Sequence, residues 1–222
     1  RYQEAIAPLK EAIRLEPNDA VSHGNLGVAY ANLSRNDEAI AEYKKALRIK
    51  PDLTIVRNNL NKLEHRIVSF MKRELRDAQE KVRQNPNDSE EHRHLGFHYS
   101  NLGQYQYAIA SYKKAIRINP DDAKAYYNLG VDYGILGQHQ DAVASYKEAI
   151  RIKPDDAQAH ISLGNSYNVL GQYQEAIAPL KEAIRLERDN SFAYGNLGFS
   201  YRSLGRYQEA IAPLKEAIRL EP

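Results

Sequence analysis

Apolar residues recur every three or four positions along most of the chain, a spacing typical of the buried face of an amphipathic helix. Residues 123–156 show this pattern most clearly, and the apolar places of the two halves are Tyr126, Leu129, Tyr133 and Leu136, then Ala142, Tyr146, Ala149 and Ile150. Gly137 stands between the halves, where a glycine commonly ends a helix. Asp121 and Asp122 precede the first half and can cap its amide groups. The stretch therefore predicts a hairpin of two helices.

The same pattern returns with a period of about 34 residues, which predicts a series of related helical hairpins. Residues 1–19 match a second helix alone, and complete copies are expected at 20–53, 89–122, 123–156, 157–190 and 191–222. We therefore expect three parts, namely a half hairpin plus one hairpin at 1–53, an altered copy at 54–88, and four hairpins at 89–222.

The residue types at fixed places of the repeat resemble the tetratricopeptide repeat (TPR) family. The matching places in the copy 123–156 hold Tyr126, Leu129, Gly130, Tyr133, Ala142, Tyr146, Ala149 and Pro154. Small residues stand where two helix axes must approach closely, and the tyrosines fill the space between the helices. The resemblance implies an all-α fold, an α-solenoid of helix-turn-helix hairpins that winds into a right-handed superhelix.

Residues 54–88 depart from the repeat where packing is most demanding. Asn61 replaces the glycine, Glu74 and Lys81 replace two close-contact alanines, and no glycine or proline occurs between Leu53 and Asn85. Burying such charges unpaired costs several kcal/mol each. One apolar stripe runs on without a turn through Val56, Leu60, Leu63, Ile67, Met71, Leu75, Ala78 and Val82. These residues predict a continuous helix from Leu53 to about Gln84, while the nearly preserved period still allows a folded hairpin.

Three prolines fall inside second helices, at Pro8, Pro179 and Pro213. Proline removes one backbone hydrogen bond from a helix interior. We expect a slight kink or a late helix start at these places.

The 222 residues include 31 basic and 29 acidic side chains, a formal net charge of +2. This balance gives no general electrostatic case for nucleic acid or membrane binding. The positive excess is concentrated in residues 54–88, which favours either a solvated helix surface or an acidic partner. Cysteine is absent, so disulfides and thiolate metal sites are excluded. The cytoplasm is the favoured location, although the composition does not identify a compartment.

The sequence contains no recognisable catalytic or cofactor motif, so we expect no enzyme activity, no cofactor and no metal. Histidines cluster only at His92, His94 and His98. His94 and His98 lie one helical turn apart, but no carboxylate follows at the next turn, where Asn101 and Leu102 stand. Two imidazoles make an incomplete metal site.

The resemblance to the TPR family implies a concave groove lined by the first helix of each hairpin. The residue before each conserved Leu-Gly pair points into that groove in the family, and these places hold Asn25, His94, Asn128, Ser162 and Asn196, with Asn59 in the altered copy. An asparagine both donates and accepts hydrogen bonds, so a row of them can hold the backbone of an extended peptide. The row is similar to the asparagine ladder of O-linked N-acetylglucosamine transferases. We expect further groove contacts from Phe97, Tyr127, Val131, Ile161, Asn165, Asn168 and Phe199.

A carboxylate clamp, which in some co-chaperones of the family grips acidic C-termini, is not matched. Arg93 and Asn128 fit its pattern, but Phe97 replaces the required asparagine, and Gln158 and Ser162 replace the two distal cations. We do not expect that function at these places.

The leading hypothesis is a scaffold that binds a peptide or helical segment of a partner protein in the concave groove. A second is the docking region of a larger enzyme, such as a glycosyltransferase. A third is a self-assembling module, in which copies of the chain pair through their ends or through residues 54–88. Residues 1–17 recur unchanged as residues 206–222, so the two ends present equivalent surfaces.

Overall fold

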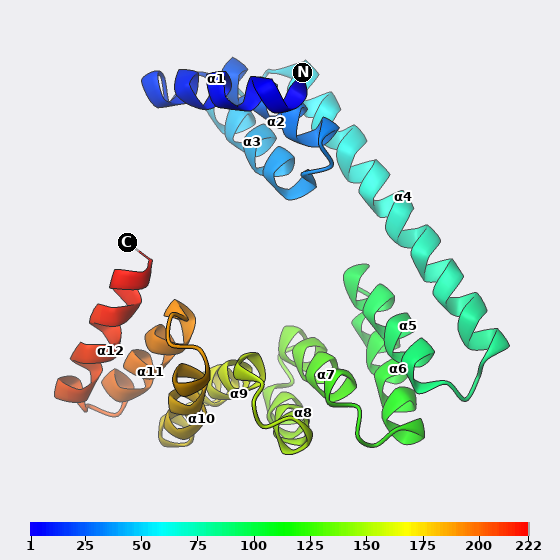
Figure 1. The fold of residues 1–222 in the computed structure, drawn as a ribbon, viewed down its shortest axis with the longest axis vertical. Helices are drawn as coiled ribbons and strands as arrows, with labels where there is room; N and C mark the ends of the chain where they lie inside the picture. The colour runs from blue at the N-terminus through cyan, green and yellow to red at the C-terminus, as the bar shows by residue number, and fades with distance from the viewer. Residues whose placement is uncertain (222) are drawn as a thin grey trace. The chain divides into compact units, whose positions relative to one another are not determined.

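The computed structural model describes residues 1–221, and the regular structure of these residues is entirely α-helical (Figure 1). The helices are α1 (Tyr2–Leu15), α2 (Ala20–Asn32), α3 (Asn36–Ile49), α4 (Thr54–Gln84), α5 (Ser89–Asn101), α6 (Tyr105–Ile118), α7 (Ala123–Ile135), α8 (His139–Ile152), α9 (Ala157–Val169), α10 (Tyr173–Leu186), α11 (Ser191–Ser203) and α12 (Tyr207–Leu220). Five hairpins, α2–α3, α5–α6, α7–α8, α9–α10 and α11–α12, follow the predicted copies.

Each first helix of a hairpin starts at a side-chain cap. The capping residues are Asp19, Asp88, Asp122, Asp156 and Asn190. In α7, for example, Oδ1 of Asp122 accepts a hydrogen bond of 3.0 Å from the backbone amide of Ala125. Such a cap satisfies an amide that has no partner within the helix, and it fixes where each hairpin begins.

The turn inside each hairpin depends on one residue in the left-handed backbone region. Gly103, Gly137, Gly171 and Gly205 occupy this place with φ between 71° and 74°, and Ser34 occupies it in α2–α3 with φ of 61°. A glycine adopts this conformation without the steric cost that a Cβ atom brings. The tight turn between the two helices of a hairpin is therefore built into the repeat.

The two helices of a hairpin approach each other where a glycine faces a large residue. A Cβ atom added to Gly96 would lie 2.5 Å from Cε1 of Tyr112, and one added to Gly130 would lie 2.7 Å from Cε1 of Tyr146. These distances are too short for a side chain, so the glycine of each Leu-Gly pair sets the spacing of the helices.

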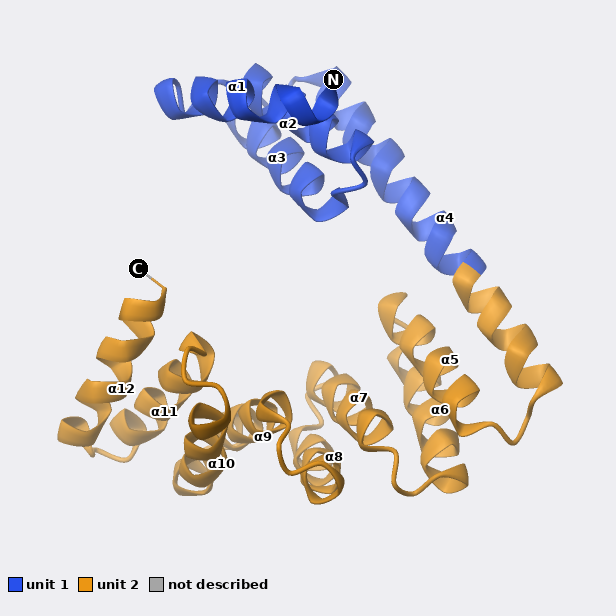
Figure 2. Ribbon diagram, viewed as in Figure 1, with its two compact units in different colours: residues 1–73 blue, residues 74–222 orange. Residues whose placement is uncertain are grey.

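The chain divides into two compact units, residues 1–73 and residues 74–222 (Figure 2). In the first unit, α1 packs on α2, and α2 pairs with α3. Its core contains Ile6, Leu26, Tyr30 and Tyr43, and the first half of α4 adds Val56, Leu60 and Leu63.

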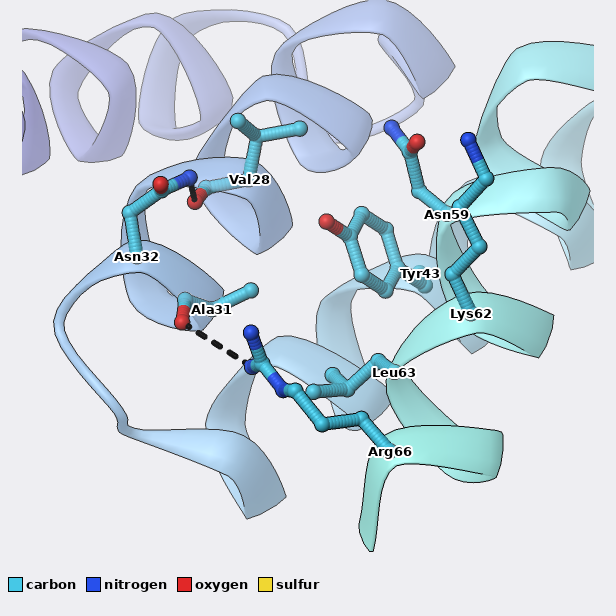
Figure 3. Close-up of a pocket in the computed structure, with 8 residues that line it drawn as sticks. All are labelled: Val28, Ala31, Asn32, Tyr43, Asn59, Lys62, Leu63 and Arg66. Atoms are coloured by element: carbon cyan, nitrogen blue, oxygen red, sulfur yellow. Dashed lines mark hydrogen bonds between the residues drawn. The ribbon is translucent and has the colours of Figure 1, made fainter. Parts of the chain in front are cut away.

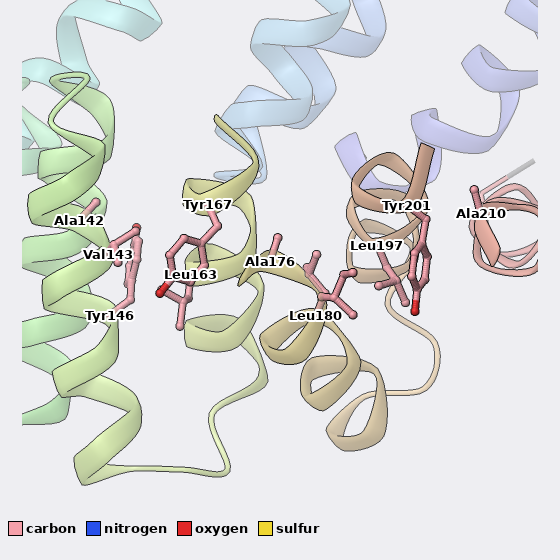
Figure 4. Packing of buried hydrophobic residues seen from close by; sticks show 11 residues of the cluster. Ala142, Val143, Tyr146, Leu163, Tyr167, Ala176, Leu180, Leu197, Tyr201 and Ala210 are labelled. Atoms are coloured by element: carbon pink, nitrogen blue, oxygen red, sulfur yellow. The ribbon is translucent and has the colours of Figure 1, made fainter. Parts of the chain in front are cut away.

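In the second unit, the hairpins stack in chain order, because each helix from α5 to α12 contacts the next. The largest core cluster runs through three hairpins and includes Tyr146, Leu163, Tyr167, Leu180, Leu197 and Tyr201 (Figure 4). The hairpin α9–α10 therefore buries side chains against both α7–α8 and α11–α12, which is the packing of an α-solenoid. The expected fold class is confirmed, while the hand of the superhelix stays a prediction.

Residues 54–84 form the single helix α4, so the continuous helix is confirmed and the folded hairpin is wrong. Val68, counted from the start of the copy, or Ser69, counted back from Pro86, stands where the other copies have the left-handed turn residue, and both are helical here. The second half of α4 packs into the second unit, where Leu75 and Ala78 form a small cluster with Leu95. One helix thus supplies side chains to two separate cores.

The prolines do not delay the helices that contain them. The helices α1, α10 and α12 begin at Tyr2, Tyr173 and Tyr207, the same place of the repeat at which the proline-free α6 and α8 begin. The expectation of a late start is wrong, because the first helical turn forms before the proline and needs no amide from it.

The sequence YQEAIAPLKEAIRL forms three different helices, α1, α10 and α12. The isoleucine at its fifth place is nearly buried as Ile6 (8% exposed) and Ile177 (7%), but it is 45% exposed as Ile211. Because the sequence is the same, the difference comes from the neighbouring helices alone.

Candidate functional site

The first helices of residues 89–222 form one continuous surface. Each of α5, α7 and α9 contacts the first helix of the next hairpin, whereas no contact joins the second helices α6, α8, α10 and α12 to one another within the described residues. We call the side formed by α5, α7, α9 and α11 the first-helix surface. Its continuity follows from the stacking of the hairpins and does not depend on particular surface residues.

Most side chains predicted to line a groove lie on this surface with at least part of their area accessible. Phe97, Asn165 and Phe199 are exposed, and the half-buried ones are His94, Tyr127, Asn128, Val131, Ser162 and Asn196. Asn25 is exposed on α2, in the first unit. These positions make the first-helix surface a mixture of amide groups and aromatic or aliphatic side chains.

Two predicted groove residues are not accessible. Ile161 is 6% exposed and packs with Ala183 and Ala193, so it belongs to the core. Asn168 is also 6% exposed. Its Nδ2 donates to the carbonyl of Asn196 at 3.1 Å, and its Oδ1 accepts from Ser200 at 2.7 Å. Both residues are corrected from groove contacts to links between neighbouring helices.

Polar contacts between successive first helices were not predicted. Besides the Asn168–Ser200 contact, Oγ of Ser100 on α5 donates to Oδ1 of Asp132 on α7 at 2.6 Å. Asp132 is 1% exposed, and its Oδ2 has no hydrogen-bond partner among residues 1–221. Burial raises the pKa of Asp132, and the hydrogen bond from Ser100 opposes this rise. Ser100 and Asn168 share one place of the repeat, and Asp132 and Ser200 share another. These short polar residues at two apposed places are the only sign in the sequence of the contacts between first helices.

The asparagines of the predicted row differ in their hydrogen bonding. Nδ2 of Asn196 donates to the carbonyl of Phe192 at 2.9 Å, within its own helix. Asn25, Asn59 and Asn128 make no side-chain hydrogen bond with the described residues. Their amide groups remain available to a ligand.

Three histidines have a structural role that the sequence analysis missed. His23, His92 and His160 stand at the same place of their copies, and Nε2 of each ring lies 2.9–3.1 Å from the carbonyl oxygen of the proline six residues earlier. A histidine six residues after the repeat proline is the signal that would have revealed this contact. Among residues 1–221, no three histidine or acidic side chains are grouped as a metal site would require.

Arg93, the cation that fits the carboxylate-clamp pattern, is engaged inside the protein. Its Nε donates to Oδ2 of Asp122 at 3.1 Å, and both side chains are mostly buried. Because Asp122 also caps α7, this ion pair connects two neighbouring hairpins and leaves Arg93 little freedom to bind a ligand.

A separate hollow of about 250 Å³ lies in the first unit, which we call the α2–α4 pocket (Figure 3). Its lining residues are Val28, Ala31, Asn32, Tyr43, Asn59, Lys62, Leu63 and Arg66. The ring of Tyr43 lies between the helices, and Arg66 reaches to the carbonyl of Ala31 at 3.5 Å (Figure 3). Burial raises the pKa of Tyr43, and the charge of Arg66 opposes this rise.

Family comparisons agree with the repeat geometry. A family described as TPR repeat matches residues 1–34 and 96–134. Two families described as Tetratricopeptide repeat match residues 20–53 and 123–156, and residues 155–220. No curated protein matches the sequence. No helix in residues 1–221 combines the length and the apolar character needed to cross a membrane.

Solved structures of similar fold include a crystal structure of MamA, which is 25% identical, with a TM-score of 0.59 over 88% of this chain and 94% of MamA. A fragment of MamA from Desulfovibrio magneticus RS-1 is 20% identical, with a TM-score of 0.58 over 91% of this chain and 94% of the fragment. The structure of YrrB, described as a TPR protein with an unusual peptide-binding site, is 19% identical, with a TM-score of 0.58 over 96% of this chain and 92% of YrrB.

Proposed function

Because the chain belongs to the tetratricopeptide repeat family, we propose that it is a non-enzymatic scaffold that binds an extended or helical segment of another protein along the first-helix surface. TPR proteins are in general protein-interaction scaffolds, and the likeness in fold to YrrB, a TPR protein with an unusual peptide-binding site, supports the finer proposal.

The observation that carries the proposal is the uninterrupted contact of α5, α7, α9 and α11. An extended segment lying across these helices meets the same places of the repeat at each step, although the residues at those places differ between copies. Asn128 offers a free amide to the peptide backbone, while Phe97 and Phe199 offer exposed aromatic faces for its side chains. Hydrogen bonds from the asparagine amides to the peptide backbone give an affinity that depends little on the peptide sequence, and contacts with the aromatic side chains give selectivity.

The test is a comparison of partner capture by three forms of the chain. The variant Asn128→Ala with Asn196→Ala removes two amide groups of the first-helix surface. The matched control, Asn18→Ala with Asn87→Ala, removes two exposed asparagines from the turns that precede α2 and α5. Partners that bind the unmodified chain and the control, but not the groove variant, are the expected result. Equal capture by all three forms would contradict a peptide site on this surface.

A further inference from the structure

The α2–α4 pocket gathers positive charge without any acidic side chain. Lys62 and Arg66 line it, and none of its other lining residues carries a charge. Neither cation forms an ion pair with residues 1–221. Two unneutralised cations at one hollow raise the local concentration of anions and favour a negatively charged group inside it.

The pocket also holds hydrogen-bond donors that have no partner in the protein. The hydroxyl of Tyr43, the amide of Asn59 and the ammonium group of Lys62 make no hydrogen bond with the described residues, and Arg66 makes only the long contact with the carbonyl of Ala31. The other lining side chains are aliphatic, except Asn32, whose Nδ2 donates to the carbonyl of Val28 at 2.8 Å. Donors of this kind, with two of them charged, match the acceptor oxygens of a carboxylate.

The arrangement is specific to α4. Asn59, Lys62 and Arg66 follow one face of the helix at spacings of three and four residues, while Leu63 points into the core beside them. The other first helices carry no charge at either of these two places. The place of Lys62 holds Val28, Phe97, Val131, Asn165 and Phe199, and the place of Arg66 holds Asn32, Asn101, Ile135, Val169 and Ser203. The altered copy forms one helix in place of a hairpin, and it carries two cations on the face that lines the α2–α4 pocket.

From this geometry we infer that the α2–α4 pocket binds a carboxylate of a peptide ligand. This inference rests on the proposed peptide-binding function, and it adds the chemical class of one group that the ligand presents. In the free chain the charged ends of Arg66 and Lys62 point to different sides of the Tyr43 ring (Figure 3). Both side chains are exposed, and on binding they turn toward the carboxylate oxygens, while the Tyr43 hydroxyl and the Asn59 amide lie beside them as further donors.

The experiment is an NMR titration of the isotopically labelled full chain with short peptides of defined charge. Acetyl-Gly-Asp-Gly-amide presents a side-chain carboxylate, acetyl-Gly-Gly-Ala with a free C-terminus presents a terminal one, and acetyl-Gly-Asn-Gly-amide is the neutral control. We expect shifts of the amide signals around Ala31, Asn59 and Arg66 with one or both acidic peptides and none with the neutral one. The acidic peptide that binds more tightly shows whether the pocket prefers a side-chain carboxylate or a terminal one.

The variants Arg66→Gln and Lys62→Gln should each weaken this binding by about tenfold, as expected for the loss of a charge-assisted hydrogen bond. Both side chains are exposed, so neither change threatens folding. Lys72→Gln, an exposed lysine on the same helix outside the pocket, is the matched control and should leave binding unchanged.

Equal weakening by Lys72→Gln, equal binding of the neutral peptide, or no shift near the pocket would each overturn the inference. A larger response to inorganic phosphate than to either acidic peptide would overturn the assignment of a carboxylate. Because the titration needs no partner protein, it can fail while partner capture by the first-helix surface succeeds, and the reverse also holds.

Discussion

At the scale of single residues, the same place of the repeat serves different purposes in different copies. Ser166, Ser200 and Asp132 occupy equivalent places. Ser166 donates to the carbonyl oxygen of Ser162 in its own helix at 2.8 Å. The single hydroxyl hydrogen of Ser200 is shared between the Asn196 carbonyl of its own helix, at 2.8 Å, and Oδ1 of Asn168 on the preceding first helix, at 2.7 Å. Asp132 instead accepts one hydrogen bond from Ser100 and buries a second oxygen that has no partner in residues 1–221. A buried carboxylate with incomplete hydrogen bonding costs stability when it is ionised.

We therefore predict that Asp132→Ser stabilises the protein at neutral pH by about 1–2 kcal/mol, the usual cost of an unsatisfied buried polar group. The pKa of Asp132 is raised in the folded state, so its cost is absent below the unfolded pKa of about 3.9 and grows as the pH rises through the folded pKa. Denaturant unfolding at neutral pH and near pH 4 should show the gain shrinking at the lower pH. Asp155→Ser, at an exposed aspartate, is the control. A gain of equal size at both pH values would rule out ionisation of Asp132 as its cause.

Burial of individual groove residues could be predicted only in part. Tyr127 and Ile161 share one place of the repeat, yet Tyr127 is half-buried and Ile161 is in the core. The ring of Tyr127 packs with that of Tyr146 on α8, the second helix of the same hairpin, at 5.8 Å between ring centres. The period of the repeat gives the direction of a side chain, but its exposure also depends on its length and on the residues opposite, which the period does not contain.

At the scale of elements, α4 shows what the residue pattern could predict. The missing turn glycine and the charges at close-contact places were sufficient to predict a continuous helix. That Lys62 and Arg66 both line one pocket was not predictable, because the sequence shows many cations in this segment and not which of them lie beside α2. Which cations lie beside α2 depends on the rotation of α4 about its axis, and this rotation is fixed by the packing of Leu60 and Leu63 in the core.

Because α4 contributes to two separate cores, substitutions in its two halves should act on different units. Leu63→Ala should destabilise residues 1–73, and Leu75→Ala should destabilise the α5–α6 end of the second unit, each by about 2–5 kcal/mol. Hydrogen exchange resolved along the chain can distinguish the two effects. Val68→Ala, on the exposed middle of α4, should change little. Loss of protection in both units from either leucine variant would show that the units unfold together.

At the scale of the whole molecule, stability is shared between neighbouring hairpins. Leu129 on α7 packs with Ala108, Ile109 and Tyr112 of the preceding hairpin. No hairpin buries its apolar residues alone, so the second unit gains stability from each interface between copies.

Leu129→Ala should therefore lower hydrogen-exchange protection in both α5–α6 and α7–α8, since the cavity opens between them. Leu136→Ala, at a more exposed leucine of the same hairpin, should have a much smaller effect. Loss of protection confined to α7–α8 would mean that the interface between hairpins contributes little.

The sequence shared by α1, α10 and α12 has a consequence for folding kinetics. During refolding, α2 meets three chemically identical candidate partners, and their contact energies cannot distinguish them. The length of the intervening chain decides between them, because only four residues separate α1 from α2, whereas about 140 separate α2 from α10. Closing the longer loop costs about 3 kcal/mol more, which favours the correct partner. This entropic selection does not act between different molecules, so concentrated refolding solutions should favour mispaired species that dilute ones avoid.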